Sequence, residues 1–373
     1  MKHKMSYLSI AALLAVSCAV LVCQTGGERS DYAPRAVTTV RSTQLAETKI
    51  VPTLNTPLGK SGNAVWCATF QVAWNRSKDK VIGGPLQIAN AQPVADRLNS
   101  SPVTEAAMPP DSYFAEAGRI DDGIVESIHH QMARQFPSVQ PPRFEGAVGF
   151  VTYGYMHTTA RFTMPFSDTK IQFADAAGGN HLVNGFGLHQ GSDWDLLDKQ
   201  ARQVKILFTE SDDEFNQPRQ NAFALDLTAD QSEQEVIVAM LPRATHLCGA
   251  LDDLEKRIAS STPDQLLEVD RMMIPNVAFS VDHDFAELEG DDKLIENPGE
   301  FQGLFIASAS QSINFRLDKS GATVVSESHV AVGAMPREFI VDRPFLIVMK
   351  RRSEVQPYFV AWVENAELLE ASR

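Results

Sequence analysis

The chain has few of the residues, and none of the short motifs, that mark common catalytic sites. Its 373 residues include four cysteines and nine histidines. It contains no G-x-S-x-G, H-E-x-x-H, Walker loop or C-x-x-C, the patterns that place a nucleophile, a zinc ion, a nucleotide phosphate or a redox pair. The sequence therefore predicts that the protein is not an enzyme and that it carries no cofactor.

The histidines do not form a metal-binding pattern. His129 and His130 fall on a predicted helix without a carboxylate at ligand spacing, which predicts a surface pair, and Asp282-His283-Asp284 is predicted to be a polar strand edge. Three further histidines lie in a region rich in glycine and aromatic residues: His157, His181 and His189. A zinc site needs three or more converging ligands. No metal is therefore predicted.

Basic residues are in the minority. There are 33 Lys and Arg against 47 Asp and Glu, a net charge of −14. Such a charge repels polyphosphates and anionic lipids, which argues against nucleic acid or a membrane surface as partner. Solubility is the plain interpretation of this acidic excess.

Only one apolar run approaches the length of a membrane span. Leu8–Cys23 follows Lys2 and Lys4, and it is shorter than the roughly 20 residues that a spanning helix needs. A basic start before such a run predicts a secretory signal over residues 1–23. Ala15-Val16-Ser17-Cys18 is similar to a lipobox, so Cys18 is a lipidation candidate. The protein is therefore predicted to be secreted or extracytoplasmic, with a membrane tether through Cys18 as the alternative.

Residues 24–47 are polar and without a period, which predicts a linker before one folded domain over 48–373. Beyond the signal, Cys67 and Cys248 are the only cysteines. In an exported protein such a pair can form a disulfide. Two free cysteines acting as small hydrophobic residues are the alternative, and the sequence leaves both open.

Periodicity predicts a mixed set of elements. Helices are predicted over Val65–Trp74, Val94–Leu98, Ile120–Phe136 and Leu247–Ile258, with a short one opened by Ser261–Asp264 and running through Val269. Strands are predicted over Ile171–Phe173, Gln203–Phe208 and Ala222–Leu227, and they dominate from Met272 onward. Because strands and helices do not alternate strictly, the fold class is α+β.

The last fifth of the chain carries the strongest functional signal. Two apolar stretches flank a mostly small and polar segment of about twenty residues, Ala322–Ile340. Loops of that length inside a compact domain are uncommon and are usually functional or disordered. Tethering by a strand at each end favours function, as a flexible segment held by a rigid body.

The motifs around this segment resemble those of serpins, the serine protease inhibitor family. Asp318-Lys319-Ser320-Gly321 stands where the family has Asp/Asn-Glu-x-Gly, and Arg343-Pro344-Phe345-Leu346-Ile347 stands where it has Arg-Pro-Phe-Leu-Phe. Upstream segments are similar to further family motifs: Gly149–Phe166, Val236–Pro242, Leu251–Glu255 and Ile274–Phe279. The chain is identified as a divergent, bacterial-like member. The resemblance implies three β-sheets with surrounding helices, an exposed reactive loop, and a serine or cysteine protease as partner.

In this family the protease cleaves the loop, and the N-terminal part of the loop then inserts into the main sheet as a new strand. The hinge implied here is Gly321, Ala322, Thr323, Val324 and Val325. Insertion requires alternate residues to face the core. The small or apolar residues share one phase: Ala322, Val324, Ser326, Ser328 and Val330. Glu327 and His329 fall in the solvent phase, so the pattern permits insertion.

Counting residues forward from Gly321 and back from Arg343-Pro344 places the cleavage position within the candidate region Val332, Gly333, Ala334 and Met335. Because Pro336 follows Met335, cleavage at Val332-Gly333 or Gly333-Ala334 is favoured. Small residues there suit elastase-like or subtilisin-like proteases.

The chain departs from the family at several positions. Lys319 replaces the Glu, and Asn276 the Lys, of an ion pair at the top of the main sheet, and Val324 and Val325 are stiffer than the usual alanines. Three residues stand where the family has other side chains under the sheet: Cys67, Phe70 and Thr152. The alternative function is therefore a non-inhibitory serpin-fold binding or structural protein. Neither the target protease nor the oligomeric state follows from the sequence.

Overall fold

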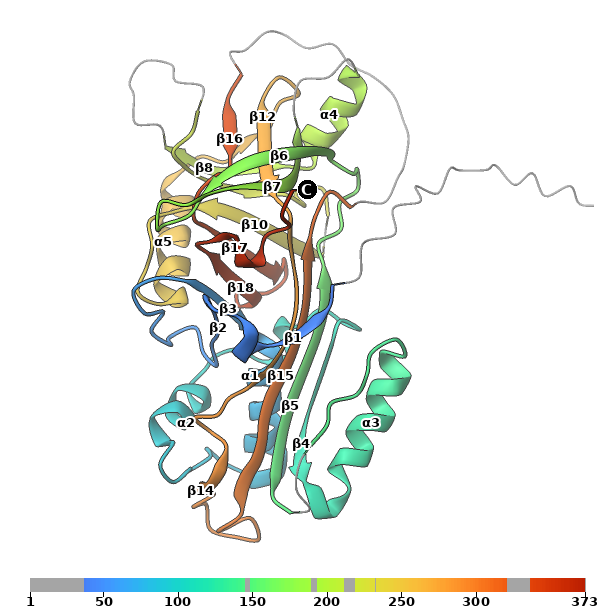
Figure 1. The fold of residues 1–373 in the computed structure, drawn as a ribbon, viewed down its shortest axis with the longest axis vertical. Coiled ribbons are helices and arrows are strands. Elements are labelled where there is room, and N and C mark those ends of the chain that lie inside the picture. Colours follow the sequence, from blue (N-terminus) through green and yellow to red (C-terminus); the bar gives the residue numbers. More distant parts are fainter. Residues whose placement is uncertain are drawn as a thin grey trace, which may run out of the picture. The chain divides into compact units, whose positions relative to one another are not determined.

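A computed structural model describes residues 37–144, 148–188, 193–210, 219–231, 233–320 and 336–372. These residues belong to one folded unit that begins at Val37. It contains three β-sheets with helices around them (Figure 1). The α+β class and the three sheets that the family resemblance implied are confirmed. Among the described residues, no helix combines the length and the apolar character needed to cross a membrane.

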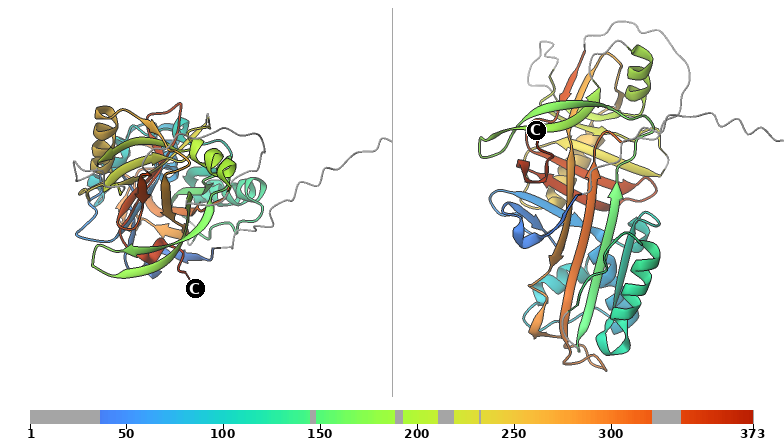
Figure 2. Two further views of the ribbon diagram at one scale, coloured as in Figure 1. Left: turned by 90° about the horizontal axis from the view of Figure 1, so that it is seen from above. Right: turned by 45° about the vertical axis from the view of Figure 1, so that its right-hand side comes forward.

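The first sheet has six strands in the order β1-β13-β15-β5-β4, with β14 paired to β15. Their bounds are Thr39–Arg41 (β1), Val277–Asp284 (β13), Phe305–Leu317 (β15), Phe150–Thr159 (β5), Tyr113–Arg119 (β4) and Gly290–Leu294 (β14). The long strands β13, β15 and β5 run side by side (Figure 2). Ile128 and Met132 of helix α3 (Ile124–Gln135) pack on one face of the sheet. Helix α1 (Ala68–Arg76) packs on the other, where its apolar residues join the main core.

The second sheet has eight strands in the order β11-β8-β9-β10-β17-β18-β3-β2. Their bounds are Asp264–Gln265 (β11), Lys205–Glu210 (β8), Ala222–Asp226 (β9), Gln234–Met240 (β10), Phe345–Arg351 (β17), Pro357–Val363 (β18), Asn63–Cys67 (β3) and Thr48–Ile50 (β2). Phe345–Met349 is at most 3% exposed, because this apolar strand lies between β10 and β18 with both faces covered.

The third sheet has four strands in the order β16-β12-β7-β6. Their bounds are Glu338–Ile340 (β16), Arg271–Pro275 (β12), Asn180–Leu188 (β7) and Ser167–Ala174 (β6). The remaining α-helices are α2 (Gln92–Asn99), α4 (Trp194–Arg202) and α5 (Leu247–Ser260). Short helical turns lie at Ser42–Gln44, Ser77–Ile82, Glu105–Ala107, Ile120–Asp122 and Ala366–Leu368.

Most predicted elements are present, but three differ. The helix predicted over Val65–Trp74 is strand β3 followed by α1. The helix predicted through Val269 is wrong, because Asp264–Gln265 is strand β11. Gln265 Nε2 donates to the carbonyls of Ala201 and Val204 at 2.9 and 2.6 Å, which holds the segment extended beside β8.

The third difference is at the predicted linker. Thr39–Arg41 pairs in parallel with Ser280–Asp282 of β13, so the folded unit begins before residue 48. This pairing also makes β13 an interior strand of its sheet. The prediction of a polar strand edge is therefore wrong at Asp282, whereas His283 and Asp284, the last residues of β13, extend beyond the pairing with β1.

The two cysteines are free, which excludes the disulfide alternative. Cys67 is buried at the start of α1, and burial raises the pKa of its thiol to about 11. A thiol with such a pKa is protonated at neutral pH and unreactive. Cys67 therefore acts as a small core residue.

Candidate functional site

The predicted hinge and the predicted cleavage positions, from Gly321 to Met335, lie outside the described residues, as does Cys18. The structure does describe both places where the loop joins the body. One is Ser320, after strand β15, and the other is Pro336, before strand β16. The site is built from these two junctions and from the sheet between them.

The first junction is organised by a buried carboxylate. Asp318, whose side chain is 1% exposed, lies 3.0 Å from Arg316 Nη1. Its Oδ1 accepts a hydrogen bond from the Ser320 backbone N–H at 2.8 Å. The carbonyls of Lys319 and Ser320 accept from the N–H groups of Phe166 and Phe162 at 3.2 and 3.1 Å. Both residues before Gly321 are thus bonded to the segment that follows β5.

The two family ion-pair positions have other partners in this chain. Lys319 Nζ pairs with Asp168 of β6, whose side chain is 69% exposed. Asn276 Nδ2 donates to Glu370 Oε2 at 2.8 Å. The ion pair expected from the family is absent at these positions, and two separate contacts replace it. An ion pair with so exposed a partner contributes little stability.

Strand β15, which leads into the loop, pairs directly and in parallel with β5. Their register runs from Ile306 opposite Phe150 to Arg316 opposite Thr159. Parallel pairs are slightly less stable per residue than antiparallel ones. The chain returns in a different sheet, because β16 pairs with β12. The two ends of the loop are therefore held by different sheets.

On the inner face of the β5–β15 pair, helix α1 approaches the backbone of β5. A Cβ atom on Gly154 would lie 2.8 Å from the backbone carbon of Thr69, so only glycine fits there. Gln311 of β15 donates from Nε2 to the Cys67 carbonyl at 3.1 Å. Thr152 Oγ1 lies 3.0 Å from Ser77 Oγ. Of the three residues singled out from the sequence, Cys67 and Phe70 lie under this sheet, at and after the start of α1, and Thr152 is in β5 itself with its side chain toward α1 and the turn that follows it.

On the outer face, side-chain hydrogen bonds link three strands. Tyr153 of β5 donates from its hydroxyl to Ser312 Oγ of β15 at 3.3 Å. Ser312 in turn donates to Asp282 Oδ1 of β13 at 2.7 Å. Burial raises the pKa of Tyr153 and raises that of Tyr155 to about 12, so both phenols stay protonated. The Tyr153–Ser312 bond crosses the β5–β15 pair and adds to the backbone ladder.

The second junction is held by the Arg337 cluster, which comprises Arg337, Asp264, Gln265 and Asp270. Arg337 Nη2 lies 2.7 Å from Asp270 Oδ2, and Nη1 lies 2.6 Å from Asp264 Oδ2. Arg337 also donates its backbone N–H to Asp270 Oδ1 at 2.9 Å. The hydrogen bond from Arg337 lowers the pKa of Asp264. The cluster fixes the start of β16.

Substituting Asp270 with alanine is expected to lower the free energy of unfolding by about 2 kcal/mol, since hydrogen bonds to charged groups contribute roughly 1.5–3 kcal/mol. The Asp270 side chain is 1% exposed, so water does not replace these bonds. Urea unfolding measures the change. Arg271→Ala is the control, because the Arg271 side chain is 45% exposed and lies 3.5 Å from Glu338. That variant is expected to change stability by less than about 0.5 kcal/mol, and equal losses in the two variants would contradict the role given to Asp270.

Among the residues that the structure describes, no group of three or more potential ligands could hold a metal. His129 is partly exposed and His130 is exposed, as expected of a surface pair, and His129 Nε2 lies 2.8 Å from the Pro142 carbonyl oxygen. His283 Nδ1 lies 2.7 Å from Ser42 Oγ, and burial lowers its pKa to about 4. His181 pairs with Asp175, and His189 lies outside the described residues.

Comparison with known proteins gives matches among solved structures. No family model and no curated protein matches the chain. Serpin-12 of Manduca sexta, a serine protease inhibitor, is 11% identical, with 84% of this chain and 95% of that chain covered and a TM-score of 0.48. Serpin48 of Tenebrio molitor is 12% identical, with 82% and 92% covered and a TM-score of 0.44.

The chain is similar in fold to serpins. Protease nexin-1, solved with heparin, is also similar, at 14% identity over 66% of each chain and a TM-score of 0.41. At 11–14% identity the likeness concerns the fold alone. Serpins are the family that the motifs around the loop had indicated.

The serpin motifs located the two loop junctions, but they missed the side chains that hold the junctions. Asp270 and Asp264 carry no signal in the sequence, because their partner Arg337 is more than sixty residues away. The Tyr153–Ser312–Asp282 chain joins three distant segments. Its only local trace is the serine at every second position of β15, at 308, 310 and 312.

Proposed function

We propose that the protein is an exported serpin-type inhibitor that acts by cleavage and insertion of the 321–335 loop. The observation that carries this proposal is the direct parallel pairing of β15 with β5. A strand that continues from β15 and turns back between them would run antiparallel to both. One parallel ladder would be replaced by two antiparallel ladders, which is favourable. The loop therefore continues directly from one of the two strands between which it would insert.

The dimensions and side chains of the loop support this proposal. Strand β5 has ten residues, and the alternating segment Ala322–Ala331 has the same length. Its inward set contains only Ala, Val and Ser. Small side chains suit this face, because α1 approaches β5 closely at Gly154.

Insertion has to break a defined set of contacts. These are the β5–β15 backbone ladder, the Tyr153–Ser312 hydrogen bond, and the bonds from Phe162 and Phe166 to the carbonyls of Ser320 and Lys319. They hold the sheet closed in the uncut protein. Because these contacts must break first, the uncut protein can persist in a state of higher free energy than the inserted state, and insertion releases the difference.

The partner in this proposal is a serine or cysteine protease that attacks the carbonyl of Val332-Gly333 or Gly333-Ala334. The peptide bond breaks, the new amino terminus leaves, and the N-terminal part of the chain stays attached to the protease as an acyl-enzyme. Insertion would then displace the attached protease before the acyl-enzyme is hydrolysed. Export through residues 1–23 belongs to the same proposal, with lipid attachment at Cys18 as one mode of anchoring. The first residue of the mature protein, read by mass spectrometry, distinguishes a lipidated Cys18 from a free terminus.

Mixing the protein with elastase and with subtilisin tests the proposal. The expected result is a protease–protein complex that survives denaturing electrophoresis and that does not form with protease whose serine has been blocked. Cleavage of the loop with full retention of protease activity and no such complex would contradict inhibition. That outcome would favour the alternative, a non-inhibitory serpin-fold binding or structural protein.

A further inference from the structure

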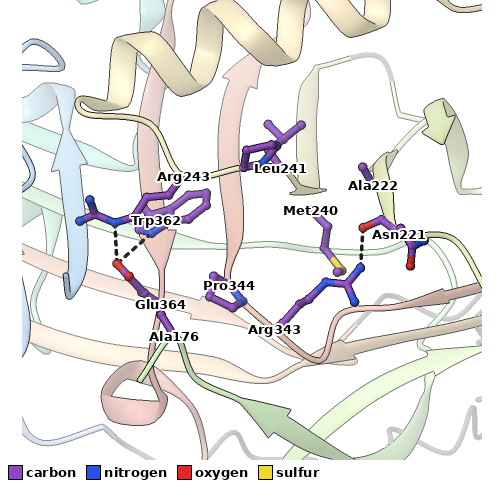
Figure 3. Close-up of a pocket in the computed structure, with 11 residues that line it drawn as sticks. Ala176, Asn221, Ala222, Met240, Leu241, Arg243, Arg343, Pro344, Trp362 and Glu364 are labelled. Carbon is purple, nitrogen blue, oxygen red and sulfur yellow. Dashed lines mark hydrogen bonds and ion pairs between the residues drawn. The ribbon is translucent and has the colours of Figure 1, made fainter. Parts of the chain in front are cut away.

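A cavity of about 380 Å³ lies where strands β10, β17 and β18 of the eight-stranded sheet meet the turn between β6 and β7 (Figure 3). Two motifs from distant parts of the sequence converge on it, Leu241-Pro242 and Arg343-Pro344. Most of its lining is apolar, from Met240, Leu241, Pro344 and Trp362. Its volume is within the roughly 300–1,000 Å³ that is typical of small-molecule sites.

The lining also contains two arginines and one carboxylate. Arg243 Nε lies 2.8 Å from Glu364 Oε2, and the Trp362 indole N–H donates to the same oxygen at 3.3 Å. Arg243 donates as well to the Gly59 carbonyl at 3.0 Å. Glu364 is buried, and its carboxylate balances the charge of Arg243. Arg243 Nη2 is buried without a hydrogen-bond partner among the described residues, so it is also available to a ligand.

Arg343 is different. Its Nη2 donates to the Asn221 carbonyl at 2.6 Å, and within the described parts of the chain no carboxylate lies in salt-bridge range of it. The residue is half-buried, so its charge is only partly screened by water. A planar guanidinium with donors to spare is suited to binding a carboxylate through two hydrogen bonds. The cavity therefore carries one net positive charge beside an apolar floor (Figure 3).

We propose that this cavity binds a small amphiphilic monocarboxylate, with its head group on Arg343 and its apolar chain against Leu241, Met240 and Pro344. A dianion fits less well, because the lining has two arginines and the carboxylate of Glu364, which leaves one net positive charge. A cationic ligand would be repelled by Arg343. The proposal is independent of protease inhibition, since the cavity lies outside the β5–β15 pair.

Titration calorimetry with octanoate tests this site. Acetate has the head group without the chain, and octylamine has the chain with the opposite charge. Octanoate is expected to bind the full protein, whereas acetate and octylamine are not. Equal binding of acetate would show an adventitious anion only, and equal binding of octylamine would show nonspecific apolar contact; either result overturns the proposal.

Two variants localise the binding. Arg343→Gln is expected to weaken octanoate binding by about tenfold or more, the loss typical of a charge-assisted hydrogen bond. Ala176→Trp, at an exposed turn position in the lining, is expected to block the cavity without altering the core. Arg134→Gln, on the exposed surface of α3, is the matched control. Melting temperatures near that of the natural protein show that the variants fold, and undiminished octanoate binding in a folded Ala176→Trp variant would also overturn the proposal.

Discussion

Protein nicked near Gly333 is expected to melt roughly 10 °C or more above the intact protein, because about 5 kcal/mol of added stability shifts the melting temperature by a few degrees per kcal/mol in a domain of this size. The stability comes from a new strand that pairs on both sides, with β15 and with β5. In the uncut chain the facing edges of β15 and β5 pair only with each other.

The measurement is calorimetry of intact protein and of protein cut by a trace of elastase or subtilisin, with the cut located by mass spectrometry. The chain cannot insert fully before cleavage, because the Arg337 cluster holds the far end of the loop in the third sheet. A nicked protein that melts no higher than the intact protein would contradict this account.

Arginine at an inward position of the hinge is expected to abolish both the gain in melting temperature and the stable protease complex. Insertion of an Ala322→Arg or Val324→Arg strand would bury an unpaired charge on the face that packs against α1. That cost is several kcal/mol, comparable to the free energy that insertion releases. These variants should therefore be cleaved as ordinary substrates.

Glu327→Arg is the matched control, because position 327 has the opposite phase and its side chain would face solvent after insertion. It is expected to retain the gain and the complex. All three variants should melt like the natural protein before cleavage, since the insertion has not yet occurred. A complex formed equally well by Ala322→Arg and Glu327→Arg would show that alternation has no role and that the loop does not enter the sheet.

The elements best predicted from the sequence are those whose signal is local. Helices α3 and α5 have apolar residues at helical spacing. The first five residues of β17, Phe345–Met349, form a continuous apolar run that is buried on both faces. The order of the motifs around residues 318–347 also located the two junctions of the loop. Each of these signals lies within a few consecutive residues.

The sequence by itself determined the fold class, the strands that flank the loop and the alternation within the loop, because these depend on side-chain period and on short motifs. Only the tertiary structure decided that residues 39–41 join a sheet, that Asp264–Gln265 is extended, and that Cys67 and Cys248 stay apart. It also brought Asp270 to Arg337 and Tyr153 to Ser312. The physical reason is that the partner of a residue in such pairs depends on burial and on the path of the chain. A contact between residues that are 67 or 159 positions apart leaves no periodic pattern in either segment.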